Sequence, residues 1–170
     1  MRILENNIEI YCNDDLRRSA FGQSYVRTCP IYLAALGREA VFGDMVKPFV
    51  IKNIVDTSDF SNVIGEGSEP FEVIGSIPKE YRQNLLDGMS GVASNLGVYV
   101  PEGYQLYAKT GTAETGEGQK PNAMFSGFVT DSSYPLAFII CVENGGYGSE
   151  VCVPIASSVL SVCKQVMDQG

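Results

Sequence analysis

Three short extended segments followed by one long apolar helix constrain the fold of this chain more than any other feature. The segments cover residues 104–113, 123–130 and 136–143, and turns rich in Gly and Glu or built from Asp-Ser-Ser separate them. Segments this short and closely spaced are typical of an antiparallel meander. Residues 150–167 should form a helix across it, which predicts an α+β fold. The apolar stripe of this helix consists of Val151, Ile155, Val159, Val162 and Val166, with Cys152, Ala156 and Cys163 adjoining it.

Two further helices are expected upstream of the extended segments. Pro30 opens an apolar stretch that reaches Phe42, and proline suits a first helical turn, so we expect a buried helix that ends at Gly43. An amphipathic helix should follow, with Ser76 as its N-cap and its end near Gly97. Its apolar stripe consists of Ile77, Tyr81, Leu85, Met89 and Val92.

The remaining segments are less regular. Residues 46–55 are rich in Val and Ile but contain Pro48, which favours a strand or extended chain. Residues 56–70 have the Gly, Ser, Asp and Glu content of a loop, and residues 1–27 form a polar, irregular lead-in. No internal repeat is present, so residues 1–170 are expected to form a single unit.

Charge and composition exclude several classes of function. The net charge is -8 at pH 7, so the chain lacks the cationic surface that nucleic acids and anionic lipids require. Histidine is absent, which excludes an imidazole base or a His-rich metal site. The five cysteines form no C-x-x-C pair, so we expect no metal, no cofactor and no disulfide framework. Three of them lie in apolar stretches and should be packed thiols: Cys141, Cys152 and Cys163.

Nothing in the sequence predicts a membrane segment. The first residues lack the basic and then apolar layout of a signal peptide. The longest uninterrupted apolar run, residues 136–142, is far shorter than the roughly 20 residues that cross a bilayer. The chain as given is expected to be soluble.

The residues Lys109, Thr110, Gly111 and Thr112 lie inside the first extended segment. K-T-G is a motif of serine β-lactamases and penicillin-binding proteins, and the longer run from Ala108 to Glu114 resembles the form found in high-molecular-weight penicillin-binding proteins. Further segments resemble patterns of that family, in family order: Ala20-Phe21-Gly22-Gln23, Thr28-Cys29-Pro30-Ile31-Tyr32-Leu33-Ala34, Leu86-Asp87-Gly88-Met89 and Met124-Phe125-Ser126-Gly127-Phe128. Ser24 and Cys29 depart from the family patterns.

The resemblance implies a role for each residue of the K-T-G-T strand. Lys109 would hold a substrate carboxylate, and Gly111 would let the acyl donor lie flat against the strand. Thr110 and Thr112 would add hydroxyls facing the substrate carboxylate, and the backbone N–H of Thr112 would form half of an oxyanion hole. The ligand implied is a peptidoglycan stem peptide ending in D-Ala-D-Ala, or a β-lactam.

The other two catalytic motifs of the family are missing from the 170 residues. The only S-x-x-K ahead of Lys109 runs from Ser76 to Lys79, and we interpret it as a helix start because it lies so close to Lys109. No S-x-N occurs, so no catalytic residue is assigned in this chain. The expectation is a C-terminal half of a transpeptidase domain, with a partial β-lactamase/transpeptidase-like fold, inactive alone.

Alternative functions and partners stay open at this point. The chain could be a non-catalytic binding module, or a relative of β-lactam sensors or β-lactamases. Without the early strands of the family fold, the 136–143 strand would be an apolar edge. We therefore expect either the missing half or a second copy to dock there, and no nucleic acid. The resemblance implies a parent protein that is extracytoplasmic and anchored at the cell envelope.

Overall fold

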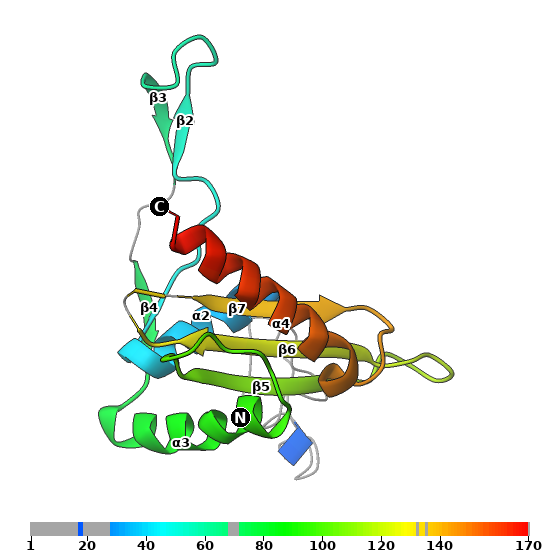
Figure 1. Cartoon of the computed structure of the whole chain (residues 1–170). Coiled ribbons are helices and arrows are strands. Elements are labelled where there is room, and N and C mark those ends of the chain that lie inside the picture. Colours follow the sequence, from blue (N-terminus) through cyan, green and yellow to red (C-terminus); the bar gives the residue numbers. More distant parts are fainter. Residues whose placement is uncertain (1–16, 19–27, 68–71, 132, 135, 170) are drawn as a thin grey trace.

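A computed structural model of the chain describes residues 17–18, 28–67, 72–131, 133–134 and 136–169 (Figure 1). Most of the lead-in expected over the N-terminal part therefore lies outside the described residues, as do the family-like positions 20–27. The elements are, in order, α2 (Pro30–Phe42), β1 (Asp44–Val46), β2 (Asn53–Val55), β3 (Val63–Glu66), β4 (Val73–Ser76), α3 (Lys79–Asn95), β5 (Leu106–Ala113), β6 (Asn122–Val129), β7 (Ala137–Val142) and α4 (Gly148–Met167).

The central layer is a three-stranded antiparallel sheet in the order β5-β6-β7, which confirms the predicted meander. Leu106 pairs with Val129 at one end of β5, and Ala113 pairs with Asn122 at the other. Helix α4 crosses one face of the sheet, α2 lies behind the other face, and α3 runs beside β5 (Figure 1). The α+β architecture expected from the sequence is therefore present.

The main core lies between the sheet and α4. Phe125 and Ala108 on the strands are completely buried, and Leu160 on α4 is 1% exposed. Burying a side chain such as Phe or Leu contributes about 2 to 3 kcal/mol by removing apolar surface from water. The residues of this cluster are Ala93, Val98, Leu106, Ala108, Ala123, Phe125, Val129, Tyr134, Cys152, Val153, Ala156 and Leu160.

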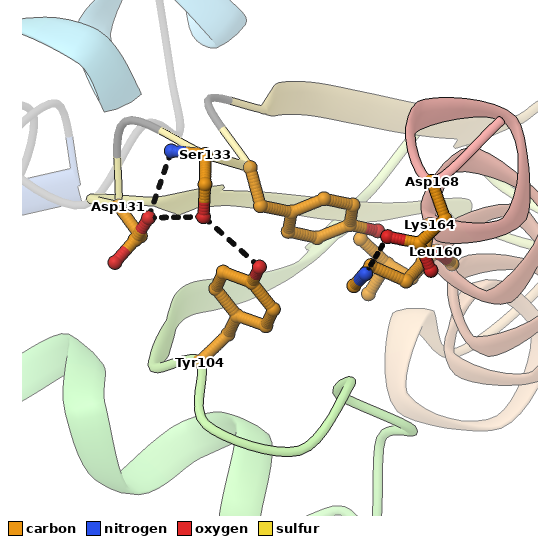
Figure 2. Close-up of polar contacts among 7 residues, drawn as sticks. Tyr104, Asp131, Ser133, Leu160, Lys164 and Asp168 are labelled. Atoms are coloured by element: carbon orange, nitrogen blue, oxygen red, sulfur yellow. Dashed lines mark hydrogen bonds and ion pairs between the residues drawn. The ribbon is translucent and has the colours of Figure 1, made fainter. Parts of the chain in front are cut away.

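A polar network ties the turn between β6 and β7 to its surroundings (Figure 2). The hydroxyl of Ser133 donates a 2.6 Å hydrogen bond to the carboxylate of Asp131, and it also lies 3.0 Å from the hydroxyl of Tyr104. At the end of α4, the ammonium of Lys164 pairs with the carboxylate of Asp168. The Ser133–Tyr104 contact holds the segment before β5 against the β6–β7 turn, and the Lys164–Asp168 pair lies within the end of α4.

The prediction of which side chains of α4 face the sheet was wrong by one row. Ile155, Val159, Val162 and Val166 are all more than 40% exposed, whereas Cys152, Val153, Ala156 and Leu160 are buried. The smaller side chains Cys152 and Ala156 let the helix approach the sheet closely, so they occupy the contact row instead of the valines.

Helix α3 shows the same kind of shift. Tyr81 and Leu85 of its predicted stripe are 59% and 39% exposed, and Ala93 is its buried residue. The expected start was also wrong, because Ser76 is the last residue of β4 and pairs with Asp44 instead of capping the helix. Pro78 occupies the N-cap position and makes no side-chain cap hydrogen bond.

The region before α3 contains more strands than the sequence predicted. Strands β1 and β4 form one antiparallel pair, and β2 and β3 form a separate pair that projects from the body of the molecule (Figure 1). Of the predicted extended stretch 46–55, only its two ends are strand, and β3 lies inside the predicted loop 56–70. These pairings are short and contain Gly65 and Gly75, which weakens their sequence signature.

Helix α2 has the predicted ends but is less buried than predicted. Pro30 lies in its first turn, and Gly43 caps its end in the left-handed conformation at φ 89°. Ala35 and Ala40 are buried, but the outer row of Ile31, Tyr32 and Leu36 is 38–45% exposed. The helix packs on the sheet through its small residues: a β-carbon on Gly37 would lie 2.9 Å from Cδ1 of Phe128. The sequence shows that the segment is apolar, but only one side of the helix packs against another element within the described residues.

Candidate functional site

The K-T-G-T residues lie on β5, which is an end strand of its sheet within the described residues. Lys109 pairs with Ser126 and Gly111 with Met124, so these four residues share the face opposite α4. Thr110 pairs with Phe125 of the core and therefore faces the α4 side, as does Thr112. The strand thus presents Lys109 on one face and the two threonines on the other, along a single edge.

The Lys109 side chain is exposed, and its ammonium donates a 2.6 Å hydrogen bond to the carbonyl oxygen of Thr110. It makes no ion pair with any carboxylate in the part of the chain that the structure describes. A lysine without a protein counter-ion carries a positive charge that a carboxylate ligand can use. Its charge is therefore available for a ligand at this edge of the sheet.

Gly111 and the turn after β5 shape the neighbouring surface. A β-carbon on Gly111 would lie 3.1 Å from Cβ of Met124, so a side chain here would press on the next strand. A shallow hollow adjoins the end of β5 in the β5–β6 turn; its lining residues are Glu114, Thr115, Gly116, Glu117, Gln119 and Pro121. Lys109 is not among them, so the hollow borders the K-T-G-T strand at its far end only.

The S-x-x-K run does not have the structure of a nucleophile site. No catalytic role was expected for the run from Ser76 to Lys79. Ser76 lies at the end of β4, and Lys79 is the first residue of α3. Both side chains are exposed, and no hydrogen bond joins them in the structure. A serine nucleophile and its lysine base must be in hydrogen-bond reach in the reacting complex.

The cysteines fall into different environments. Cys152 is fully buried, as predicted, and burial raises the pKa of its thiol. Cys163 is half-buried, but Cys141 is exposed on the end strand β7, so the prediction of a packed thiol was wrong there. Within the described ranges no group of three or more His, Cys, Asp or Glu side chains could hold a metal ion.

Helix α4 is long and apolar enough to cross a membrane, which was not expected from the sequence. Among the residues described, it is the one helix that passes this test. These properties are also typical of a core helix, and here α4 packs on the sheet through Cys152, Ala156 and Leu160.

Comparison with known proteins relates the chain to a protein family. The family model for the penicillin binding protein transpeptidase domain matches residues 11–161. A comparison with curated proteins finds no match.

Solved structures share the fold. Penicillin-binding protein A from Mycobacterium tuberculosis is 22% identical with a TM-score of 0.69, and the match covers 87% of this chain and 35% of that one. Its penicillin G acyl-enzyme complex matches with 19% identity and a TM-score of 0.68, over 91% of this chain and 36% of that one. The D,D-transpeptidase domain of a peptidoglycan glycosyltransferase from Eggerthella lenta matches with 21% identity and a TM-score of 0.56, over 81% and 31%.

This chain spans about a third of the length of these structures. The family model covers most of the 170 residues. The chain therefore belongs to the penicillin-binding protein transpeptidase family.

Proposed function

We propose that this chain supplies the side of a peptidoglycan D,D-transpeptidase site that binds the substrate carboxylate and the oxyanion. The observation that carries the proposal is the position of Lys109, Gly111 and Thr112 on an end strand, with the Lys109 ammonium exposed and free of protein carboxylates within the described residues. The substrate would be a stem peptide ending in D-Ala-D-Ala, and β-lactams would be its mimics.

Each group on the strand has a physical task in this proposal. An extended peptide can align with the outer edge of β5, which pairs with no other strand within the described residues, and Gly111 adds no side chain that would push it away. The Lys109 ammonium would attract the terminal carboxylate from one face of the strand, and the hydroxyls of Thr110 and Thr112 would add hydrogen bonds to it from the other face, around the outer edge. The backbone N–H of Thr112 would stabilise the negative charge that develops on the carbonyl oxygen during acyl transfer.

The nucleophilic serine and its base would come from polypeptide outside the 170 residues, either in the same protein or in a partner. Acyl transfer needs the nucleophile, a base and oxyanion donors together, so this chain alone should not be acylated. The reaction would take place outside the cytoplasm, at the cell envelope, because peptidoglycan is assembled there.

The nucleophile-bearing polypeptide would dock on β7 and the outer face of α4. Within the described residues β7 has a strand on one side only, which leaves backbone groups free to pair with an added strand. The neighbouring exposed valines of α4 are Val159, Val162 and Val166. A second copy of the chain is the other occupant that this surface could take. Sedimentation velocity separates the two, because a stable homodimer of the chain alone would favour the second copy.

Labelling with a fluorescent penicillin tests the proposal. The chain alone should remain unlabelled, and a preparation that joins it to the S-x-x-K polypeptide should label covalently on that polypeptide. Covalent label on the isolated chain would contradict our assignment of the nucleophile. Reversible binding without any covalent label in the complete domain would support a non-catalytic binding module instead.

A further inference from the structure

The first residue of α4 rests directly on the backbone of the K-T-G-T strand. Gly148 is buried, and a β-carbon placed on it would lie 2.5 Å from the carbonyl oxygen of Gly111 and 2.2 Å from that of Met124. These oxygens belong to paired residues of β5 and β6, so neither can move aside as a flexible side chain could. Only glycine allows this approach of the helix to the sheet.

The contact falls on one particular peptide unit. The carbonyl group of Gly111 and the N–H group of Thr112 belong to the same planar peptide bond, and in its trans form they point in opposite directions. Any rotation of this unit that turned the Thr112 N–H would also swing the Gly111 oxygen, which Gly148 closely approaches.

We propose that Gly148 is a positioning residue that sets the direction of the Thr112 N–H, the oxyanion donor of the function proposed above, on which this inference rests. The start of α4 would prevent the Gly111–Thr112 peptide unit from rotating toward the helix. A donor held in advance stabilises the developing charge without reorganising during the reaction. A side chain at position 148 would push on the Gly111 oxygen and misdirect the donor without touching the substrate.

The chain offers a matched control for this idea. Gly127 is also buried in the sheet, and a β-carbon there would lie 2.8 Å from Cζ of Phe138 and 3.1 Å from Cδ1 of Leu106. Both of these atoms belong to side chains in the core and not to the peptide unit of the oxyanion donor. Gly127→Ala should therefore destabilise the fold without moving the Thr112 N–H.

The kinetic test uses the chain joined to its nucleophile-bearing polypeptide, with fluorescent penicillin as the probe. The first-order acylation rate constant is measured separately from the dissociation constant of the initial complex. Gly148→Ala should lower the rate constant by about tenfold or more, while the dissociation constant changes much less. Gly127→Ala should keep the wild-type rate constant at a similar loss of melting temperature. Equal rate constants for the two folded variants would overturn the inference.

A second measurement separates failure of this inference from failure of the proposed function. If the wild-type domain is never acylated, the proposed function fails, but the position of the Thr112 amide can still be followed by NMR in the chain as given. Gly148→Ala should shift the Thr112 amide resonance more than Gly127→Ala does. A Thr112 resonance that responds equally to both substitutions would contradict a positioning role for Gly148.

A milder pair of variants serves if Gly148→Ala does not fold. Tyr147 is the N-cap of α4, is 61% exposed and makes no side-chain cap hydrogen bond. Tyr147→Asp should stabilise the first turn of α4 by capping it, and Tyr147→Ala should leave the turn uncapped, as it is in the wild type. The exchange of the Thr112 amide with solvent should slow in the first variant and keep the wild-type rate in the second. Equal exchange in the two variants would overturn the inference.

Discussion

The hydroxyl of Tyr134 donates a 2.6 Å hydrogen bond to the carbonyl oxygen of Leu160, in the middle of α4. Tyr134 is completely buried, and its ring lies 5.0 Å from that of Tyr104. Because this contact joins the β6–β7 turn to α4, it helps to hold the helix along the sheet.

Tyr134→Phe should lower the free energy of unfolding by about 1 kcal/mol, since it removes one buried hydrogen bond and keeps the ring contacts. Urea unfolding followed by circular dichroism measures the difference. Tyr81→Phe is the matched control, because Tyr81 is 59% exposed and its hydroxyl is in water. Equal stability of Tyr134→Phe and the wild type would show that the hydrogen bond contributes nothing.

Alkaline pH should weaken the fold through the same residue. Burial raises the pKa of Tyr134 from 10.0 to about 12. Above pH 10 the unfolded chain therefore releases this proton before the folded chain does, so stability falls as the pH rises toward 12. The stability difference between wild type and Tyr134→Phe should narrow from about pH 9 to about pH 11. A difference that stays constant over this range would contradict the raised pKa.

Glu39 should destabilise the fold when it is ionised. This residue of α2 is 6% exposed; burial raises the pKa of its carboxyl above the ordinary 4.5, and the nearby Asp44 carboxylate raises it further. Stability should fall as the pH rises through this raised pKa, because the folded state holds the proton more tightly than the unfolded state. Glu39→Gln should therefore increase the stability at neutral pH and change it little at a pH below 4.5. Glu102→Gln, at an exposed site, is the control and should leave the stability at neutral pH unchanged.

A better N-cap should stabilise α2. Cys29 occupies the N-cap with φ -106° and ψ 156°, the extended conformation that capping residues adopt, but makes no side-chain cap hydrogen bond. Cys29→Ser should raise the free energy of unfolding by about 0.5 to 1 kcal/mol, because its hydroxyl can accept a hydrogen bond from a free N–H of the first turn. Cys29→Ala should bring no gain in the same urea titration. An equal gain in the free energy of unfolding of both variants would show that the gain comes from removal of the thiol and not from capping.

Alternating side chains and turn residues were enough to predict β5, β6, β7 and α4, because this meander pairs neighbours in the sequence. The pairing of β1 with β4 was missed, since it joins Asp44 to Ser76 across a long separation. Periodicity also identified apolar stripes on α3 and α4 without showing which row touches the sheet. That choice depends on how closely small residues such as Ala156 let the helix approach.

The candidate site was predictable to a similar degree. The motif predicted that Lys109 lies on a strand, and the structure places it there. Lys109 and Thr110 lie on opposite faces of the strand because successive side chains alternate, so this arrangement could have been derived once the motif was placed on a strand. The contact of Gly148 with Gly111 could not, because Gly148 follows Gly145, Gly146 and Tyr147 in a run that has only the signature of a loop.

Lys109 should matter for acylation and not for folding. In the complete domain, Lys109→Ala should lower the rate of penicillin acylation by about 100-fold or more, because it removes a charge aimed at the substrate. The free energy of unfolding of Lys109→Ala should differ from that of the wild type by less than about 0.5 kcal/mol, since the Lys109 side chain is exposed and forms no ion pair in the described part of the chain.

Lys79→Ala is the matched control, because Lys79 is also exposed and belongs to the only S-x-x-K run ahead of the K-T-G-T strand. It should keep the wild-type acylation rate. Loss of acylation in Lys79→Ala alone would move the catalytic lysine to the start of α3 and refute the assignment of the K-T-G-T strand. Lys109→Arg adds a further distinction, because it keeps the positive charge but spreads it over a planar group. Partial activity in this variant would show that charge dominates at position 109, and complete loss would show that the point geometry of an ammonium is required.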